Sequence, residues 1–377
     1  MNRKCGWFVI LFLFSCSALQ GSNNLLDDLE RDIRDRRLDR FSHIAAAFIL
    51  SGAHNETELH RYLDWYRDLV STIKDYRFDT FDRIGSAAKV FSYLHATHLE
   101  HYNETATTLI DIVNHKQFNC VSSTILYNLV CRDLGWPTEA FETPTHTYTV
   151  FPNFTQQIMV ENTIPYGFNI MENLRQYNQY LLQYYPQERR LQIGLDRIYE
   201  YENSNGRPID NTELLGLLAY NRAYFSRSKG DFEKAYRYVK IAQDFNHHSP
   251  SNKNFEINLY YEWGQKLYQS GQHTRAFHVY ADALQRHWTN KDFVNNCQVA
   301  YFNAQSENWN RKNWDEFKEL FSRMWELNIL PNKYIDQEKQ HMHAWIQYSS
   351  LHYAPAKQHD IIYFWRKYFP NDPILDN

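Results

Sequence analysis

The chain has 377 residues, of which 43% are hydrophobic and 16% aromatic, and its formal net charge is −4. This composition supplies enough apolar side chains for two folded domains and excludes a disordered chain. Without Arg3 and Lys4, which belong to a predicted leader, 38 basic residues face 44 acidic ones, so the basic footprint of a nucleic-acid-binding protein is also excluded.

A short apolar segment follows the first charged residues. Arg3 and Lys4 precede an apolar run over residues 6–14, which is too short to cross a bilayer, because a helical span needs about 20 residues. Small and polar residues follow up to Ser22. This pattern is typical of secretion, so we expect residues 1–21 to be a signal peptide and the mature protein to be exported.

Within this segment, Leu13-Phe14-Ser15-Cys16 is similar to a bacterial lipobox. A lipoprotein signal would end at residue 15, and Cys16 would carry the lipid that anchors the protein to a membrane of the bacterial envelope. Ordinary cleavage near Gly21, with release into the periplasm, is the alternative. No later segment approaches about 18 continuous apolar residues, so membrane contact is expected only through such an anchor.

Helical periodicity marks residues 24–115, where apolar side chains recur at three- and four-residue spacing. One stripe consists of Leu26, Leu29, Ile33, Phe41, Ile44 and Phe48, and a second of Leu59, Leu63, Tyr66, Leu69, Val70 and Ile73. Gly52 and a helix start at residues 55–58 separate the two. We expect these helices to pack around the next predicted helix.

That next helix is predicted over residues 121–134, with Gly135 ending it and Pro137 preventing its continuation. Asn119 is its natural N-cap. Cys120, in the first turn, meets the positive end of the helix dipole and unpaired backbone N–H groups, which favour the thiolate and can hold an oxyanion. Cys120 is therefore the candidate nucleophile.

An antiparallel hairpin is predicted next, because residues 146–151 and 158–163 are rich in β-formers and a turn-like segment separates them. In this hairpin His146 falls roughly opposite Glu161 or Asn162, at the distance of about 5 Å at which cross-strand side chains interact. A thiol, a histidine and a carboxylate or amide form a set of nucleophile, base and orienting group. Successive strand residues face opposite sides, so the register decides between Glu161, which we favour, and Asn162.

Four segments in this order resemble the bacterial transglutaminase-like cysteine peptidase families, including the SirB1-like group. They are Phe118-Asn119-Cys120-Val121-Ser122-Ser123, Gly135-Trp136-Pro137, Glu142-Thr143-Pro144-Thr145-His146 and Val160-Glu161-Asn162-Thr163. The resemblance covers about residues 80–170. It implies a papain-related α+β core with a short antiparallel sheet, in which Cys120 lies on a helix and His146 and the acid lie on adjacent strands. It also implies amide hydrolysis or acyl transfer on a peptide or protein substrate, without a cofactor.

Two positions depart from the family pattern. Glu161-Asn162 stands where Asp, often before Pro, is usual, and Thr145 stands where Gly is common. Gln117, just before the helix, is a candidate oxyanion donor, and its alternative role is that of a solvated loop residue.

The second cysteine of this helix and a run of histidines do not indicate a disulfide or a metal site. Cys131 lies on the same helix face as Cys120 but about 16 Å along the axis, so the two cannot form a disulfide. His95, His98 and His101 are spaced by three without a carboxylate or cysteine in register, so we expect no metal site.

Residues 200–210, rich in Asn, Gly and Pro, form the predicted linker between a transglutaminase-like domain at 22–200 and a second domain at 201–377. In the second domain similar segments recur 41 residues apart. They are Gly230-Asp231-Phe232-Glu233-Lys234-Ala235 and Gly271-Gln272-His273-Thr274-Arg275-Ala276, followed by the degenerate Lys312-Asn313-Trp314-Asp315-Glu316-Phe317. Small residues at Ala223 and Gly264 keep the same frame. The pattern resembles tetratricopeptide repeats, which implies an all-α array that binds a protein partner.

Two classes of function fit these patterns. The first is an exported thiol enzyme that acts through Cys120, His146 and Glu161 and uses its helical repeats for partner binding. The second is a catalytically idle transglutaminase-like fold that serves as an interaction scaffold in the cell envelope.

Overall fold

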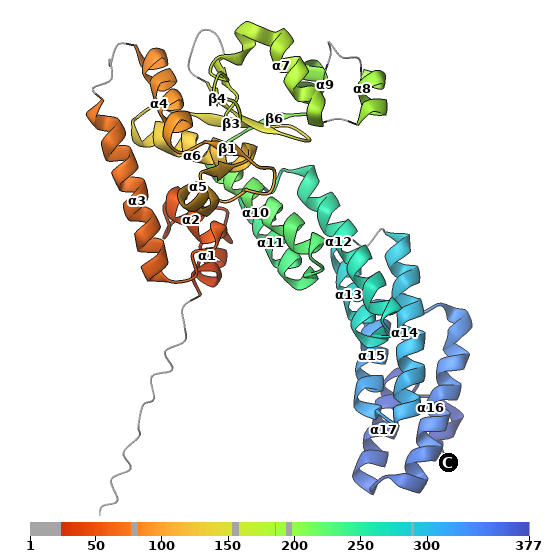
Figure 1. The fold of residues 1–377 in the computed structure, drawn as a ribbon. Helices are drawn as coiled ribbons and strands as arrows, with labels where there is room; N and C mark the ends of the chain where they lie inside the picture. The colour runs from red at the N-terminus through yellow and green to blue at the C-terminus, as the bar shows by residue number, and fades with distance from the viewer. Residues whose placement is uncertain are drawn as a thin grey trace, which may run out of the picture. The chain divides into compact units, whose positions relative to one another are not determined.

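The computed structural model describes residues 24–76, 82–152, 158–184, 186–193, 198–287 and 290–376. Its chain divides into two compact units. Unit 1 comprises the described part of Met1–Ala223 together with Lys240–Ser249, and unit 2 comprises Tyr224–Val239 and the described part of Pro250–Asn377. The fold class is α+β, because the chain is mostly helical and unit 1 carries one small antiparallel sheet (Figure 1).

Unit 1 begins with the helices predicted over residues 24–115. They are α1 (Leu25–Ile33), α2 (His43–Ser51), α3 (Glu56–Asp75), α4 (Arg83–Thr97) and α5 (Leu109–His115). As the sequence indicated, a polar side chain starts α3: Asn55 accepts a hydrogen bond from the Glu58 N–H. Gly52 ends α2 with a φ of 113°, a conformation that glycine adopts without steric cost.

The helix that carries Cys120, α6 (Cys120–Asp133), begins and ends one residue earlier than predicted and has the predicted N-cap, Asn119. Gly135, with a φ of 82°, follows its end. Helix α6 is preceded by a two-stranded parallel ladder of β1 (His101–Tyr102) and β2 (Gln117–Phe118). The sequence pattern did not indicate this ladder. Side chains on all faces of α6 are buried, so this helix lies in the core of unit 1.

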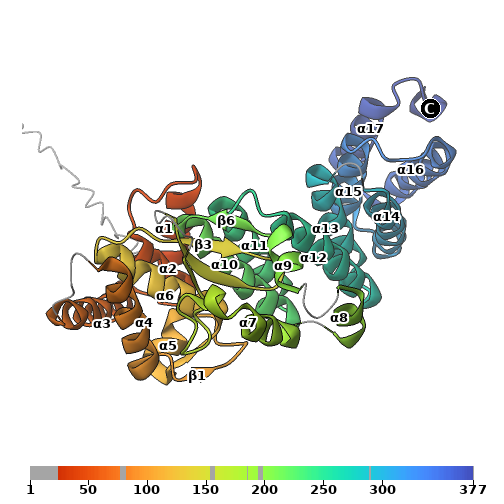
Figure 2. The same cartoon turned by 90° about the horizontal axis from the view of Figure 1, so that it is seen from above.

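The antiparallel sheet of unit 1 has the strand order β5-β4-β3-β6. The strands are β3 (Glu139–Glu142), β4 (Thr147–Phe151), β5 (Ile158–Val160) and β6 (Arg207–Ile209). β4 and β5 confirm the predicted hairpin, whereas β3 and β6 were not predicted. Helix α6 lies on one side of the sheet, and α7 (Leu174–Leu181) and α9 (Ile198–Ser204) lie on the other (Figures 1 and 2).

Alternation along β4 divides its side chains between these two sides. Tyr148 and Val150 pack with Tyr177 and Leu181 of α7. Thr149 faces α6, and its hydroxyl donates to Oδ1 of Asn128 at 2.5 Å. The remaining elements of this part are η1 (Ile170–Asn173), η2 (Leu182–Tyr184) and α8 (Gln187–Ile193).

The two units divide within α10 (Asn211–Ser228) and α11 (Phe232–Phe245), and not at residue 200 as the composition of the predicted linker indicated. The reason is that β6 pairs with β3 and buries Ile209, so residues 207–209 belong to the sheet. Asn246 and Ser249 also donate to the buried Glu142 carboxylate, at 3.1 and 2.8 Å. Unit 1 therefore needs chain beyond residue 200.

Unit 2 is a succession of helices, most of which pack on a neighbour along the chain. Beyond the parts of α10 and α11 that it includes, they are α12 (Pro250–Gln269), α13 (His273–Arg286), α14 (Lys291–Arg311), α15 (Trp314–Glu326), α16 (Asn332–His352), α17 (Pro355–Tyr368) and η4 (Pro373–Asp376). Gly264 allows α12 and α13 to pack closely, because a Cβ there would meet the Tyr280 ring at 2.4 Å. Phe317, at the degenerate position, is buried and stacks on Trp314.

Truncation tests where unit 1 ends. A fragment of residues 24–249 keeps β6 and the partners of Glu142, so we expect it to be monomeric and to unfold cooperatively on heating. A fragment of residues 24–200 leaves an edge of β3 unpaired and the apolar neighbours of α10 exposed, so we expect it to aggregate. Size-exclusion chromatography and thermal circular dichroism distinguish the two, and a well-folded 24–200 fragment would contradict the assignment of β6 to unit 1.

Candidate functional site

Cys120 is the first residue of α6, and Asn119 fixes the start of the helix through a reciprocal cap. Oδ1 of Asn119 accepts from the N–H groups of Val121 and Ser122 at 3.0 and 3.1 Å, and Oγ of Ser122 accepts from the Asn119 N–H at 3.0 Å. The cap therefore uses two of the N–H groups that the sequence left open to an oxyanion, and the Cys120 N–H is not among its donors. The Cys120 side chain is partly exposed.

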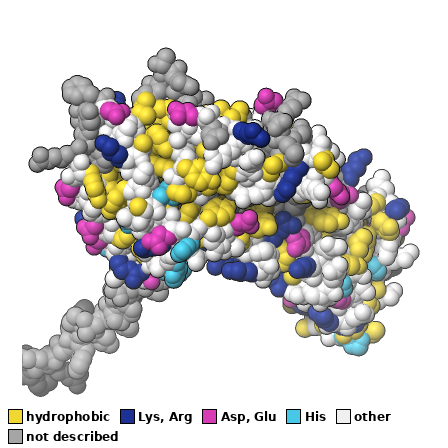
Figure 3. All heavy atoms as spheres, turned by 45° about the horizontal axis from the view of Figure 1, so that its top comes forward, with side chains coloured by type: hydrophobic (Ala, Val, Ile, Leu, Met, Phe, Trp, Pro, Cys, Tyr) yellow, Lys and Arg dark blue, Asp and Glu magenta, His cyan; other side chains and the backbone are white. Residues whose placement is uncertain are grey.

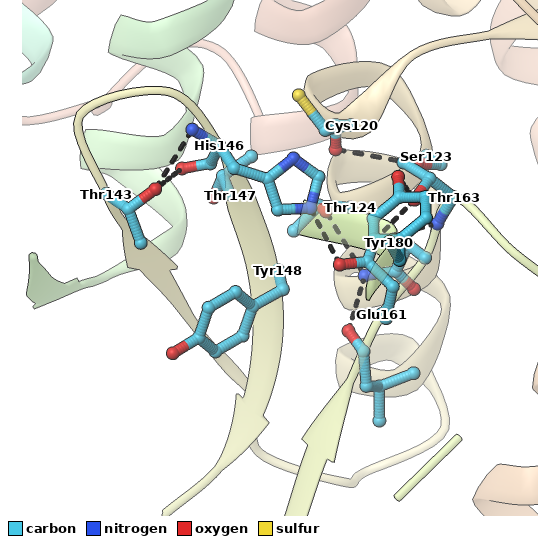
Figure 4. A network of polar contacts seen from close by, with 12 residues as sticks. Cys120, Ser123, Thr124, Thr143, His146, Thr147, Tyr148, Glu161, Thr163 and Tyr180 are labelled. Atoms are coloured by element: carbon cyan, nitrogen blue, oxygen red, sulfur yellow. Dashed lines mark hydrogen bonds and ion pairs between the residues drawn. The ribbon is translucent and has the colours of Figure 1, made fainter. Parts of the chain in front are cut away.

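His146 is held at the entrance to β4 by a tight turn. Its backbone N–H donates to Oγ1 of Thr143 at 2.9 Å, and its carbonyl accepts from the Thr143 N–H at 2.9 Å. The side chain of His146 is only 1% exposed. Figure 4 shows the imidazole between Cys120 and Glu161, with one ring nitrogen turned toward each.

Glu161, just after β5, is the carboxylate that meets the histidine. The Nε2 to Oε2 distance between His146 and Glu161 is 2.7 Å, and the Glu161 side chain is fully buried. Thr149 pairs with Val160, so continuing the register sets Tyr148 against Glu161 and His146 against Thr163. Glu161 is therefore a diagonal neighbour of His146 on the same face of the sheet. The sequence pattern had placed the two residues roughly opposite each other.

Asn162 points to the opposite face of the sheet. Its Nδ2 donates to Oγ1 of Thr124 on α6 at 3.1 Å and to Oγ1 of Thr149 on β4 at 2.8 Å. Of the two alternatives left open by the sequence, the structure thus brings Glu161 to His146 and gives Asn162 a packing role between α6 and the sheet.

Burial and charge act in opposite directions on the His146–Glu161 pair. Burial lowers the pKa of His146, but the charges of Glu161 and Cys120 and the hydrogen bonds to both raise it well above its usual value. Burial raises the pKa of Glu161, and the charge and hydrogen bond of His146 together with bonds from Thr163 bring it below its usual value. The imidazolium and the carboxylate therefore stabilise each other.

The other candidate residues lie outside this arrangement. Oε1 of Gln117 accepts from Nδ2 of Asn103 at 3.0 Å, a contact between the segments around β1 and β2. Cys131 and Cys297 are buried; burial raises the pKa of Cys131 to about 12 and raises the pKa of Cys297 as well. Cys16 and the rest of the predicted signal peptide lie outside the described residues.

Three residues of the site carried no assigned role in the sequence pattern. Thr143 belongs to the turn-like run before His146, where a hydroxyl that bonds the backbone is a known turn signal. Thr163 donates to Oε1 of Glu161 through both its N–H, at 3.1 Å, and its hydroxyl, at 2.5 Å. Tyr180 of α7 forms a hydrogen bond with the Thr163 hydroxyl. Tyr180 could not be found by motif, because it comes from a separate helix.

In the described part of the chain, no group of three or more His, Cys, Asp or Glu side chains is arranged to hold a metal ion. Burial lowers the pKa of His95 to about 4 and also lowers that of His98. None of the described helices is both long and apolar enough to cross a bilayer.

The sequence matches no known family model, and no curated protein matches it. Among solved structures, a crystal structure of menin, described as revealing the binding site for the Mixed Lineage Leukemia protein, aligns with 79% of this chain and 74% of the menin chain. The sequence identity is 11% and the TM-score is 0.29, which is too low to assign a fold or a function.

Substitution of Glu161 and of Asn162 should affect stability with different pH dependence. Because the pKa of His146 is raised in the folded state, His146 stabilises the fold fully below about pH 6.5, and this stabilisation is lost as the pH rises through the pKa of the folded state. Because the pKa of Glu161 is lowered in the folded state, Glu161 stabilises the fold fully above about pH 4.3, and this stabilisation is lost as the pH falls through the pKa of the folded state. Glu161→Gln should therefore lower the free energy of unfolding most between these pH values, by about 3 kcal/mol.

Asn162→Ala is the matched control, because its amide does not titrate. It should cost about 1–3 kcal/mol at every pH through the lost bonds to Thr124 and Thr149. Urea unfolding from pH 3.5 to 9 measures both variants. A pH-independent loss in Glu161→Gln would contradict an ion pair with His146.

Gly167 should be essential to the position of Glu161. The Gly167 carbonyl accepts from the Glu161 N–H at 2.9 Å, and a Cβ at Gly167 would meet the Glu161 carbonyl oxygen at 2.0 Å. Gly167→Ala must therefore displace this segment, and we expect a loss of about 1–3 kcal/mol. Gly135→Ala, where no atom lies within 4 Å of the new Cβ, should cost only its backbone strain, about 1 kcal/mol. Equal melting temperatures for the two variants would contradict the close packing at Gly167.

Proposed function

We propose that unit 1 is a transglutaminase-like thiol enzyme that hydrolyses amides or transfers acyl groups through Cys120, with His146 as base and acid and Glu161 as orienting residue. The observation that carries this proposal is the buried imidazole between the Cys120 side chain and the Glu161 carboxylate (Figure 4). Because Nε2 donates to Glu161, the other ring nitrogen, Nδ1, is the one that serves Cys120. The resemblance of the four segments to the transglutaminase-like peptidases supports the same assignment.

The reaction follows from the thiolate and imidazolium pair. The Cys120 thiolate attacks the substrate carbonyl carbon and forms a carbon–sulfur bond, and the carbonyl oxygen becomes an oxyanion. His146 then gives its proton to the leaving amine as the carbon–nitrogen bond breaks, which leaves an acyl-Cys120. In hydrolysis, neutral His146 takes a proton from water, the resulting hydroxide attacks the thioester, and the thiolate leaves again. An amine in place of water gives acyl transfer.

The oxyanion requires donors close to the nucleophile. The Cys120 N–H is suited to this role, because it lies at the positive end of α6 and the Asn119 cap does not use it. Gln117 remains the candidate second donor. Its amide oxygen is bonded to Asn103, which leaves the amide NH₂ group as the part that can donate.

A peptide or protein substrate suits the surface of unit 1. Tyr102 is 39% exposed, and it pairs through β1 with Phe118, two residues before Cys120. Figure 3 shows apolar side chains gathered in a band on the visible face of unit 1. Exposed aromatic and aliphatic side chains are typical of surfaces that bind other proteins.

Unit 2 is proposed to bind a protein partner as a tetratricopeptide-like array. The Gly230 and Gly271 segments, the close packing of Gly264 against Tyr280, and a cavity of about 830 Å³ on α13, α15 and α17 support this role. We further propose that the protein is exported to the periplasm or the bacterial envelope, with lipidation at Cys16 or ordinary signal cleavage. The apolar run after Arg3 and Lys4 supports export.

Alkylation of the cysteines tests the proposed nucleophile. Iodoacetamide at pH 6 should label Cys120 at least about tenfold faster than Cys131 or Cys297, which are protonated and buried. His146→Ala should remove this advantage, because the thiolate loses its cation. Peptide mapping by mass spectrometry measures each site separately.

Trapping of the acyl intermediate tests turnover. With denatured casein as the acyl donor and hydroxylamine as the acceptor, the wild-type protein should form hydroxamates, and Cys120→Ser should form none while keeping its melting temperature. A reactive Cys120 without acyl transfer or peptide cleavage would favour the idle scaffold. Equal, slow labelling of all three cysteines would contradict the thiol enzyme altogether.

A further inference from the structure

Helix α7 brings a tyrosine to the carboxylate of the site. The helix packs on the sheet through the buried side chains of Tyr177 and Leu181, which belong to the same cluster as Tyr148 and Val150. Tyr180 follows Tyr177 by three residues and lies on the same face of the helix, and the two rings stack with centroids 6.2 Å apart. The docking of α7 therefore fixes the position of the Tyr180 hydroxyl.

The hydrogen bonds between Tyr180, Thr163 and Glu161 have a defined direction. The Glu161 carboxylate is ionised and can only accept, so the Thr163 hydroxyl gives its single hydrogen to Oε1 of Glu161 at 2.5 Å. Tyr180 must then be the donor in its bond to Oγ1 of Thr163. The hydrogens thus all point from α7 toward the carboxylate.

The second oxygen of the Glu161 carboxylate extends this series of hydrogen bonds to His146. Its Oε2 accepts from Nε2 of His146, whose second nitrogen faces Cys120. The ring of Tyr180 also meets the imidazole edge to face, with centroids 6.2 Å apart, so it helps to keep water from the bond between His146 and Glu161. Hydrogen bonds in such a buried chain polarise one another and become stronger.

We propose that Thr163 and Tyr180 are positioning residues of the thiol site: their hydroxyls hold the Glu161 carboxylate charged and oriented, and through it hold His146 as the partner of Cys120. This inference rests on the proposed function and adds a dependence on the docking of α7. The charged carboxylate stabilises the imidazolium, and the imidazolium stabilises the thiolate. Each lost hydroxyl therefore lowers the fraction of reactive thiolate at acidic pH.

The pH profile of Cys120 alkylation measures this effect in the full-length protein without a substrate. Thr163→Val removes the hydroxyl at nearly constant volume, and we expect its acid limb to move up by about one pH unit, because a hydrogen bond to a charged group is lost. Tyr180→Phe removes the outer bond, so it should move the limb by about half a unit, which is about a threefold slower reaction at pH 6. Thr163→Ser keeps the hydroxyl and should restore the wild-type profile.

A matched control comes from another tyrosine of unit 1. The Tyr66 hydroxyl donates to Oδ2 of Asp133 at 2.9 Å, so Tyr66→Phe also removes a part-buried bond to a carboxylate. This variant should leave the alkylation profile unchanged. Melting temperatures recorded in parallel separate a change in the site from a general loss of stability.

The outcomes separate this inference from the proposed function. Upward shifts in Thr163→Val and Tyr180→Phe, with wild-type profiles in Thr163→Ser and Tyr66→Phe, support the positioning role. A reactive wild-type Cys120 whose profile is unchanged in both Thr163→Val and Tyr180→Phe overturns the positioning role and leaves the thiol enzyme standing. A wild-type Cys120 that reacts no faster than Cys131 overturns both.

Discussion

The pairing of His146 with Glu161 depends on the alternation of side chains at the end of the β4–β5 hairpin. On one face of the sheet, Glu161 accepts the Nε2 proton of His146 and leaves the other ring nitrogen toward Cys120. On the other face, Asn162 bonds Thr124 and Thr149 and holds α6 against the strands. A shift of the register by one residue would exchange these roles and place a carboxylate in the packing between helix and sheet.

Burial strengthens the attraction between His146 and Glu161, but removing both charges from water costs free energy. Two charges removed from water are stable only when each satisfies the other and the remaining oxygens and hydrogens find partners. Here the second carboxylate oxygen is bonded twice by Thr163, and the turn at Thr143 holds the histidine backbone. Loss of any one partner leaves a buried charge uncompensated, which is why small substitutions at Glu161 or Thr163 should have effects far beyond their volume.

Unit 1 places its elements around the site in three layers, with helices on both sides of the sheet. Helix α6, below the sheet, presents Cys120 at its first turn, while α7, on the opposite side, reaches Glu161 through Thr163. The sheet between them is completed by β6, more than 40 residues after β5. A site made from residues 120–161 thus depends on chain segments as late as the end of α11, because these segments complete and cover the sheet that positions it.

The sequence alone determined the local features of the site. Helical spacing and the polar Asn119 predicted α6 and its cap, and β-forming runs predicted the β4–β5 hairpin with His146 at its start. These features depend on interactions between residues that are close in sequence. Residue types and their spacing are therefore enough to predict them. The same holds for the helices before residue 115 and for the Gly135 stop.

Only the tertiary structure decided how these local elements contact one another. The register that selects Glu161 over Asn162, the place of Tyr180, and the role of residues 207–209 as an edge strand all depend on contacts between distant segments. The Asn, Gly and Pro of residues 200–210 indicated a linker, since those residues favour turns wherever they occur. Only the unpaired edge of β3, which no local pattern reports, explains why the chain forms a strand there.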